Sequence, residues 1–438
     1  MKKGKLLISL VTFLVFLSSM ALANGLNLNG LGARAVAMGG AFVGLADDFS
    51  AVYWNPAGAA LFGKKYFGFS GFAILPSMSY KLDLLGMTMV DATAPSKVYP
   101  GGLAAYYHPI SDKLTAGISV YSPSGLGMKW DGADFANVSG PPNIAPNPNI
   151  KWESFVFMVT ASPTVAYKIS DQVSLGAALN VSYASVDLAM YAGTANPFPG
   201  VFVGLGQQEI KMTGWGLGAT LGVLVTPSEY FSVGATFRTP SKFSLSGDAE
   251  ISGFPQLGLE DTSGIETEIT WPMWVAVGVA VHPIDNLVLT FDVQYTDWKQ
   301  IDVLELSFEN PFWDATMALS GENEMAMHWE SKTQLRVGAE YKISDSFALR
   351  GGYYYDPTPS PDKTLNVLLP SATFNGFCGG FGYNANGLAL DFTVEYLTGK
   401  NRDVPYLKTV TDPDWESAMP GMYELSVLTF EFSVGYKW

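Results

Sequence analysis

The chain has 438 residues and a formal net charge of −15, with 40 Asp and Glu residues against 25 Lys and Arg. This acidic balance argues against a nucleic-acid partner, which requires a basic surface. Only 15% of the residues are charged, whereas 13% are aromatic and 46 are glycine, a composition that fits an antiparallel barrel with a lipid-facing surface. Cys378 is the only cysteine, which excludes an internal disulfide framework and leaves a free buried thiol as the simplest interpretation.

The first 23 residues have the features of a secretory signal peptide. Three lysines lie among the first five residues, an apolar run follows at positions 6–17, and Ala21-Leu22-Ala23 supplies the small-residue cleavage pattern. We therefore predict a signal peptide over residues 1–23 and export of the chain. A membrane anchor is the alternative, but the apolar run is shorter than the roughly 20 residues that a spanning helix needs.

Residues 24–63 do not follow the alternating pattern of a strand. They are rich in Gly and Ala, and Asn55-Pro56 suits a helix start, with Asn as the N-cap and Pro at the first helical position. A segment of this length is too short for a separate domain and too apolar for a solvated tail. We predict that it forms a small N-terminal hatch, or plug, inside the lumen of a barrel built by residues 64–438. Three glycines on one strand face are expected to leave room for its backbone: Gly214, Gly216 and Gly218.

A phrase that recurs through the chain predicts the number of strands. Five copies run from an apolar or aromatic residue through a Pro, Ser or Asp turn into an alternating segment, and Asn386-Gly387 adds a sixth turn suited to a tight hairpin. The five turn positions are Asp112, Asp171, Glu229, Asp285 and Asp345, spaced by 59, 58, 56 and 60 residues. Each spacing accommodates two spanning strands, one short turn and one long connection. Six short turns, with one strand before the first pair and one after the last, predict an all-β, 14-stranded antiparallel transmembrane β-barrel.

The strand segments alternate two kinds of side chain. At positions 287–295 the odd residues are apolar or aromatic, whereas most of the even ones are polar. We expect the apolar face to meet lipid and the polar face to line a hydrated lumen. The charged residues on the polar face are Arg238, Asp292, Arg336, Glu340, Arg350, Asp391 and Glu395.

The long connections are expected at the opposite end of the barrel from the short turns. They include positions 81–96 and 123–152, and they hold most of the prolines. The connection at 302–325 has six acidic residues and no Lys or Arg, which indicates a solvated acidic loop. Divalent-ion bridging to outer-leaflet phosphates is the alternative.

Several segments, in order along the chain, resemble a known family. They are G-L-G-A-R-A-V-A-M-G-G-A-F-V-G-L-A-D-D-F-S-A-V-Y-W-N-P-A from Gly30, Y-S-P-S-G-L-G-M-K-W from Tyr121, G-A-T-F-R-T-P from Gly234, W-P-M-W-V-A-V-G from Trp271 and L-R-G-G-Y-Y-Y-D-P-T-P-S-P-D from Leu349. The chain resembles the FadL/TodX/OmpP1 family of outer-membrane long-chain fatty acid and hydrocarbon transporters. The resemblance implies a fourteen-strand barrel with an N-terminal hatch, ligand capture in extracellular loops, an internal apolar pocket and a lateral opening at the third strand.

The resemblance also assigns a role to the Asn-Pro-Ala sequence near the end of the N-terminal segment. By this likeness Asn55, Pro56 and Ala57 form the hatch motif that is latched against the barrel wall. Ser122, on the third strand, takes the position of the latch partner.

The third strand runs from Leu114 into a segment that disfavours regular pairing. Pro lacks the donor for the strand ladder and Gly weakens pairing, so Pro123, Gly125 and Gly127 predict a kink at the lateral opening. The alternative is that Pro123 ends the strand and begins the loop.

The ligand-binding residues are expected among the apolar residues near the loops and the N-terminus. No basic headgroup motif of the family, Lys-x-Glu, can be placed near positions 323–330, so the sequence leaves open whether the ligand is a carboxylate or a neutral hydrocarbon. An interfacial aromatic girdle or loop packing is the alternative role for such residues. The candidates are Leu26, Trp130, Phe198, Phe202, Phe312 and Trp313.

Catalytic motifs are missing from the sequence, which contains no H-E-x-x-H, Walker loop or G-x-S-x-G element. We expect no enzyme activity, cofactor or metal. The predicted function is diffusion-driven uptake of hydrophobic small molecules across a bacterial outer membrane, by a monomer in contact with outer-membrane lipid and lipopolysaccharide. The alternatives are an adhesin or structural barrel, or a general porin without a hydrophobic ligand.

Overall fold

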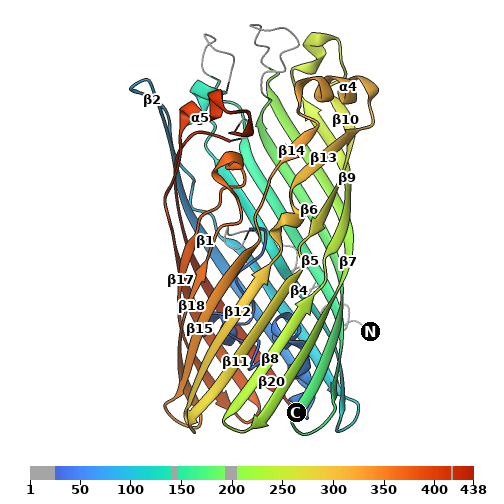
Figure 1. Cartoon of the computed structure of the whole chain (residues 1–438), viewed down its shortest axis with the longest axis vertical. Helices are drawn as coiled ribbons and strands as arrows, with labels where there is room; N and C mark the ends of the chain where they lie inside the picture. Colours follow the sequence, from blue (N-terminus) through green and yellow to red (C-terminus); the bar gives the residue numbers. More distant parts are fainter. Residues whose placement is uncertain (1–24, 140–146, 193–204, 416–417) are drawn as a thin grey trace, which may run out of the picture.

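The computed structural model describes residues 25–139, 147–192, 205–415 and 418–438, and within these ranges the fold is a closed antiparallel barrel of fourteen strands (Figure 1). The wall closes where β1 pairs with β20, from Tyr66 opposite Lys437 to Lys81 opposite Met422. The predicted all-β class and strand number are therefore confirmed. In chain order the strands are β1 (Tyr66–Leu84), β2 with β3 (Met87–Thr93 and Tyr99–Pro109), β4 (Leu114–Trp130), β5 (Trp152–Lys168), β6 (Val173–Tyr191), β7 (Gln207–Ser228), β8 with β9 (Phe231–Arg238 and Ser241–Ile251), β10 with β11 (Thr262–Trp271 and Trp274–Ile284), β12 with β13 (Leu287–Thr296 and Val303–Phe308), β14 with β15 (Glu324–Ala326 and Lys332–Lys342), β16 (Phe347–Asp356), β17 (Phe374–Ala385), β18 (Leu388–Gly399) and β20 (Gly421–Lys437), and β19 (Arg402–Val404) pairs with β20.

The helical elements are short. They are α2 (Ala33–Ala37), α3 (Ala51–Trp54), α4 (Pro311–Ser320) and α5 (Tyr406–Thr411), with the 3₁₀ turns η1 (Pro56–Leu61), η2 (Ala136–Val138), η3 (Phe254–Leu257), η4 (Trp298–Gln300), η5 (Asp362–Thr364) and η6 (Pro413–Trp415). Among the described residues, no helix has the length and apolar character needed to cross a membrane.

The six predicted short turns all connect consecutive strands at one end of the barrel (Figure 1). At the last of them, Asn386 and Gly387 have φ angles of 52° and 85°, the positive values that a two-residue hairpin turn of type I′ requires. The first long connection was predicted wrongly. β1 and β2 continue as a paired hairpin through Leu85-Gly86.

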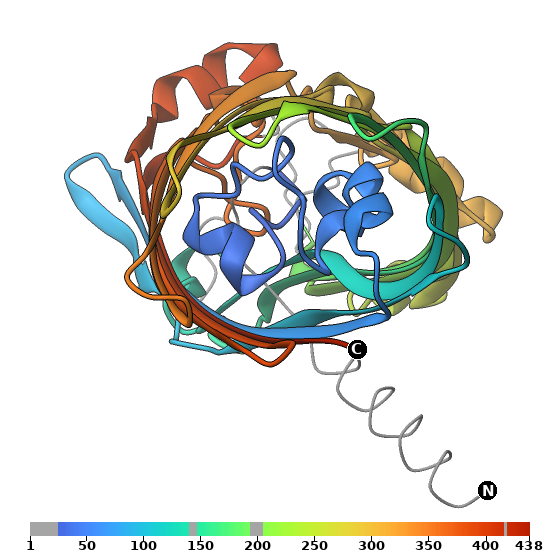
Figure 2. The ribbon, with the colours of Figure 1, turned by 90° about the horizontal axis from the view of Figure 1, so that it is seen from below.

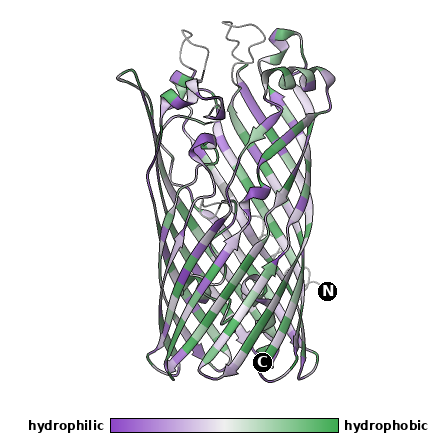
Figure 3. Ribbon diagram, viewed as in Figure 1, coloured by the Kyte–Doolittle hydropathy of each residue, from purple (hydrophilic) through white to green (hydrophobic). Residues whose placement is uncertain are grey.

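The outward-facing residues of the wall are mainly apolar, and hydrophobic and hydrophilic residues alternate along the strands (Figure 3). Large exposed side chains on this face include Ile118, Trp215 and Phe381. A barrel surface of this kind is stable against hydrocarbon and unstable against water.

The N-terminal segment, residues 25–63, lies inside the barrel toward the short-turn end (Figures 1 and 2). It is buried almost throughout, and Phe42 and Trp54 are among the largest fully buried side chains of the described residues. Much of the polar inner face of the wall therefore contacts protein, while a polar hollow of about 470 Å³ remains at the short-turn end among Glu340, Arg350 and Asp391.

Candidate functional site

Side chains of the barrel wall bind the backbone of the N-terminal segment. Asp292 on β12 accepts hydrogen bonds from the backbone N–H groups of Phe42 and Val43, at 2.9 and 3.0 Å. Glu431 on β20 accepts from the Gly32 N–H at 2.8 Å, and Arg336 on β15 donates to the Gly39 carbonyl at 2.9 Å. Because buried polar groups need partners, these bonds explain why the wall keeps charges in a lipid-embedded barrel.

One ionic network joins the segment to the wall. Arg34 of α2 pairs with Glu340 at 2.7 Å, and Arg350 pairs with the same carboxylate at 2.6 Å and with Asp391 at 2.7 Å. Close by in the segment, burial raises the pKa of Asp48, although Arg34 and a hydrogen bond from the Ser50 side chain oppose that rise. The network is fully paired, which is the condition for a buried charge cluster to be tolerated.

Asn55 lies at the point where the segment meets strands β7 and β8, and its side chain is fully buried. Its Nδ2 donates to the carbonyls of Val43 and Val223 at 3.0 and 2.9 Å, while its Oδ1 accepts from the Ala57 N–H at 3.1 Å. The last bond is the predicted N-cap. The wall partner of Asn55 is therefore Val223 of β7.

Ser122 of β4, the predicted wall partner of Asn55, does not take this role. Both Ser122 and Asn55 belong to the described part of the chain, and no hydrogen bond joins them. Asn55 can approach the wall closely because Gly222 and Gly234 have no side chain. A Cβ at either position would overlap the Asn55 side chain. The three glycines proposed for this purpose face other groups, since Gly216 lies against the Phe243 ring and Gly214 against the Ser244 carbonyl.

Strands β3 and β4 separate above Leu103 and Tyr121. They pair from Pro109 opposite Thr115 to Leu103 opposite Tyr121, while β4 continues to Trp130 paired only with β5. A register shift between Tyr121 and Ser124 marks the position of Pro123. The strand therefore continues beyond Pro123 with a bulge, and the alternative that Pro123 ends it is excluded.

The seam that results is in contact with the N-terminal segment. The Leu28 N–H donates to the Pro123 carbonyl at 2.9 Å. Ser124 is buried and, among the described residues, its hydroxyl has no hydrogen-bond partner. Gly125 and Gly127 lie on β4 opposite Phe157 and Phe155 of β5, on the side of the seam that remains paired.

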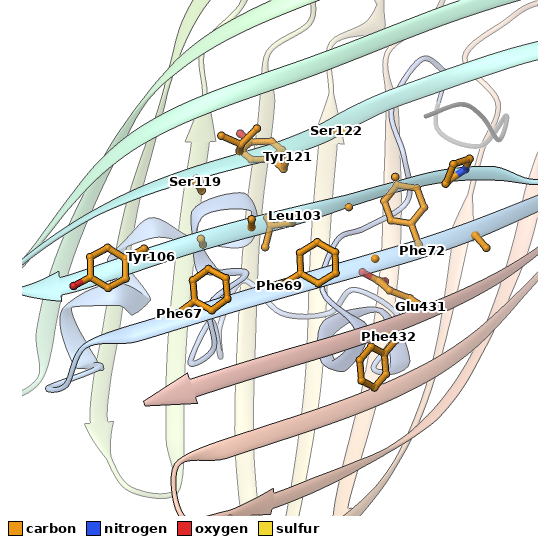
Figure 4. A pocket seen from close by; sticks show the side chains of 18 of the residues that line it. Phe67, Phe69, Phe72, Leu103, Tyr106, Ser119, Tyr121, Ser122, Glu431 and Phe432 are labelled. Carbon is orange, nitrogen blue, oxygen red and sulfur yellow. The ribbon is translucent and has the colours of Figure 1, made fainter. Parts of the chain in front are cut away.

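A hollow of about 920 Å³ lies in the wall at the lower end of this seam. Figure 4 shows Phe67, Phe69 and Phe72 of β1 beside Leu103 and Tyr106 of β3. The lining of the hollow combines outward-facing and inward-facing residues. The wall is thinner at Gly71, Gly101 and Gly102, which have no side chains. Apart from Glu431 at its inner side, the lining is apolar or carries hydroxyl groups only.

A second, smaller cavity of about 60 Å³ lies in the barrel on the long-loop side of the N-terminal segment. Its lining contains no charged side chain, and the only hydroxyl, that of Thr267, donates to the Glu305 carbonyl at 2.7 Å. Leu26 belongs to the lining, as do three methionines, whose flexible side chains adapt to ligands of different shape. The other lining residues are Val156, Ala184, Val186, Leu188, Met212, Phe243, Leu245, Ile269, Trp271, Ile301, Leu304, Leu306, Met325, Met327 and Leu369.

The loop at residues 357–373 folds into the mouth of the barrel above this cavity. Trp130 Nε1 of β4 donates to the Val367 carbonyl at 2.9 Å, and Ser154 of β5 donates to the Leu368 carbonyl. Leu365 and Val367 are fully buried. Because β4 and β5 lie far along the wall from the strands that this loop connects, the loop spans the lumen.

The other predicted ligand residues have different positions. Trp130 holds the loop at 357–373 and does not line the cavity. Trp313 is fully buried against Phe254, with its indole N–H donating to the Glu260 carbonyl at 2.8 Å, and Phe312 is 71% exposed on α4. Phe198 and Phe202 lie outside the described residues.

The cavity residues that sequence reasoning missed lie near the loops, on the inward faces of β5, β6, β7, β9 and β10, on β13 and β14, and in the connecting segments that hold Ile301, Met327 and Leu369. The available signal was the sequence of β7, where the inward positions change from Gly216 and Gly214 to Met212 and Ile210. The inner face is thus apolar near the loops and polar where the N-terminal segment docks. Period-two alternation alone does not distinguish a lipid-facing from a cavity-facing apolar residue.

A closed barrel with an apolar outer wall, short turns at one end and long loops at the other defines the class of bacterial outer-membrane β-barrel proteins. Residues 14–438 match the family described as "Outer membrane protein transport protein (OMPP1/FadL/TodX)". The protein belongs to this family, as the sequence motifs indicated.

Curated relatives are distant but match along most of their length. Outer membrane protein P1 of Haemophilus influenzae is 21% identical over 417 residues, covering 86% of each chain. The long-chain fatty acid transport protein of Escherichia coli is 23% identical over 431 residues, covering 90% of this chain and 91% of the relative. These relatives and the fold support an outer-membrane location.

Solved structures share the fold. A FadL homologue of Pseudomonas aeruginosa has a TM-score of 0.76 at 18% identity, covering 94% of this chain and 99% of the other. The toluene transporter TodX of Pseudomonas putida has a TM-score of 0.69 at 17% identity, with the same coverage.

Proposed function

We propose that the protein is an outer-membrane channel for diffusion-driven uptake of hydrophobic small molecules, and that its ligand is an uncharged hydrocarbon. The observation that carries the proposal is the apolar cavity under the loop at 357–373, because its lining offers apolar contact and no charged group. Binding there is driven by burial of apolar surface, at about 25 cal/mol per Å². Diffusion needs no energy source, and we assign no catalytic step to the protein.

The proposed route begins at the long-loop end. A molecule enters when the loop at 357–373 withdraws from Trp130, and it then occupies the cavity around Leu26. The cavity in its closed form has room for only a small molecule, so a longer ligand requires displacement of the flexible lining, of which Met212 and Met327 are part.

We further propose that residues 25–63 act as a hatch and that the seam between β3 and β4 is the lateral exit. Two features support this. The hatch touches the seam through the bond from Leu28 to Pro123, and an apolar hollow lies in the wall where pairing of the two strands ends. A hydrophobic molecule that leaves at this point enters the bilayer directly and avoids the polar lipopolysaccharide layer.

A long-chain fatty acid is the second candidate ligand, and one observation favours it. Arg238 of β8 donates from Nη2 to the Tyr53 carbonyl of the hatch at 2.9 Å, and its guanidinium carbon lies 4.9 Å from the ring centroids of Tyr53 and Trp274. Its Nε is buried and, within the described residues, has no hydrogen-bond partner. A carboxylate is the group that pairs best with a guanidinium in such a position.

The two candidates are separated by uptake into proteoliposomes with naphthalene, hexadecane and oleate as probes. The first proposal expects uptake of the hydrocarbons in preference to oleate, and equal hydrocarbon uptake by an Arg238→Gln variant. The second expects preferential oleate uptake that falls in Arg238→Gln.

Mass spectrometry of small molecules extracted from the purified protein provides an independent test of the ligand class. If none of the three probes enters faster than through empty liposomes, and large steady ion currents are recorded, the protein is a general porin. If no probe enters and no current flows, the barrel has an adhesive or structural role. Either result contradicts the proposed function.

A further inference from the structure

The outer wall of β4 to β7 carries a compact group of charged residues at the long-loop end. Strand register places Lys129, Glu153 and Glu209 in one cross-strand row, with Ala189 between the two carboxylates. The next row toward the membrane centre contains Phe155, Asp187 and Lys211. Lys151 precedes β5 and Lys97 precedes β3, and both line the same hollow of about 270 Å³.

Aromatic residues in the second row and below it fix the height of the group relative to the bilayer. Phe155 stacks on Phe157 at 6.1 Å, and Tyr183 contacts Trp215 at 5.1 Å between ring centroids. Trp215 is 65% exposed on the outer face. Aromatic side chains of this kind mark the membrane interface, so the charged rows lie at the level of the outer-leaflet headgroups.

The lysines at this level are held only by weak partners. Lys129 pairs with Glu153 at 2.6 Å, and both Lys151 and Lys211 pair with Glu209, at 2.5 and 3.3 Å. Exposed pairs of this type contribute about 0–1 kcal/mol. Lys97 lies over the Tyr99 ring at 5.3 Å and, among the described residues, forms no salt bridge. Stronger anions can therefore displace these partners.

We propose that Lys97, Lys129, Lys151 and Lys211, together called the lysine face, bind the phosphorylated sugar headgroup of an outer-leaflet glycolipid of the lipid A type. Phosphates are strong acceptors for lysine. The aromatic residues beside and below the lysine face provide contacts for the acyl chains of the same lipid. The four lysines outnumber the three carboxylates that line the same hollow, Glu153, Asp187 and Glu209, so the hollow has a small net positive charge in a chain of net charge −15. This inference does not depend on which solute the channel carries.

The test measures lipid binding to the full-length protein in detergent by native mass spectrometry. The probes are bisphosphorylated lipid A and the same lipid A after removal of both phosphates. The variant Lys129→Gln/Lys151→Gln/Lys211→Gln is compared with a matched control, Lys81→Gln/Lys242→Gln/Lys332→Gln, whose lysines form comparable ion pairs elsewhere.

We expect the first variant to bind bisphosphorylated lipid A at least about tenfold more weakly, the control to bind it within about twofold of the wild type, and the dephosphorylated lipid to bind all three proteins equally weakly. The single variant Lys211→Gln, at a 66% exposed side chain, gives a smaller loss without risk to folding. Equal binding by both triple variants, tight binding of dephosphorylated lipid A, or displacement of lipid A by micromolar inorganic phosphate would each overturn the proposal.

Discussion

Replacing Asn55 by Ala tests whether this residue latches the N-terminal segment to the wall. The substitution removes two side-chain donors and leaves the carbonyls of Val43 and Val223 without those bonds. It also removes the cap on the Ala57 N–H. Each lost bond to a buried neutral partner costs about 1–3 kcal/mol, and the lost N-cap costs about 1 kcal/mol. With the lower value for each of the two bonds, the total is about 3 kcal/mol.

A loss of that size favours opening of the segment roughly a hundredfold. Amide hydrogen exchange resolved by peptide measures it directly. Amides of residues 25–63 should exchange up to about a hundredfold faster in Asn55→Ala, whereas amides of β15 to β18 should keep their protection, because the barrel ladder is unaltered. Uptake of hydrophobic probes should fall and the ion leak should rise.

The matched control is Asn384→Ala, which removes an exposed Asn side chain near the short-turn end and should leave exchange of the segment unchanged. The latch interpretation is refuted if Asn55→Ala leaves exchange over residues 25–63 as slow as in the wild type while the protein shows wild-type heat-modifiable migration on gels. Exchange that accelerates in the barrel strands as well would show that the residue stabilises the whole fold.

Three further substitutions address the proposed entry, the ionic network and the proposed exit. Trp130→Phe removes the bond to the Val367 carbonyl. Loss of this bond costs about 1 kcal/mol, so the loop at 357–373 should open about fivefold more often. The measurement is amide exchange, which should be faster in that loop and unchanged at residues 25–63. Glu340→Gln leaves the buried Arg350 with one carboxylate partner and should destabilise the barrel by about 3–5 kcal/mol. Heat-modifiability gels should show a lower unfolding temperature, and an unchanged temperature would contradict the role of the network. Ala104→Trp fills the wall hollow from the lipid side and should slow hydrophobic uptake several-fold while ligand binding in the cavity persists; unchanged uptake would exclude this hollow as the exit.

The strand number was predictable because it depends on local signals. A turn such as Asn386-Gly387 has backbone angles that few residue pairs tolerate, and the spacing of such turns counts hairpins without any knowledge of contacts. The same reasoning failed at positions 81–96. There β1 and β2 extend beyond the wall as a hairpin, and the sequence alone does not show where a strand leaves the membrane.

The course of β4 depended on a choice that the sequence left open. Pro123 lacks a ladder donor, and a strand either ends at such a residue or accommodates it with a bulge. The structure has the bulge, between Tyr121 and Ser124, and β5 remains paired with β4 beyond it. The outcome depends on pairing with β5, which is a tertiary contact.

The position of Asn55 shows the same limit. Its N-cap bond to Ala57 is local and was predicted correctly. Its wall partner was not, because the register of β7 and β8 decides which glycines face the segment, and Gly222 and Gly234 take that position. The family resemblance directed attention to Ser122, whereas the geometry directs it to Val223 of β7.

The inner face of the barrel has two kinds of surface, and each fits one kind of occupant. Near the short turns, charged side chains such as Asp292 and Arg336 bind backbone groups of the N-terminal segment, and such bonds are costly to break because both partners are desolvated. Near the loops, the lining is apolar and rich in methionine, a surface from which the proposed ligand can enter and leave without leaving a polar group unpaired. A permanent occupant held by directional bonds and a transient one held by non-directional burial can thus share one lumen, and the seam between β3 and β4 lies where the two surfaces meet.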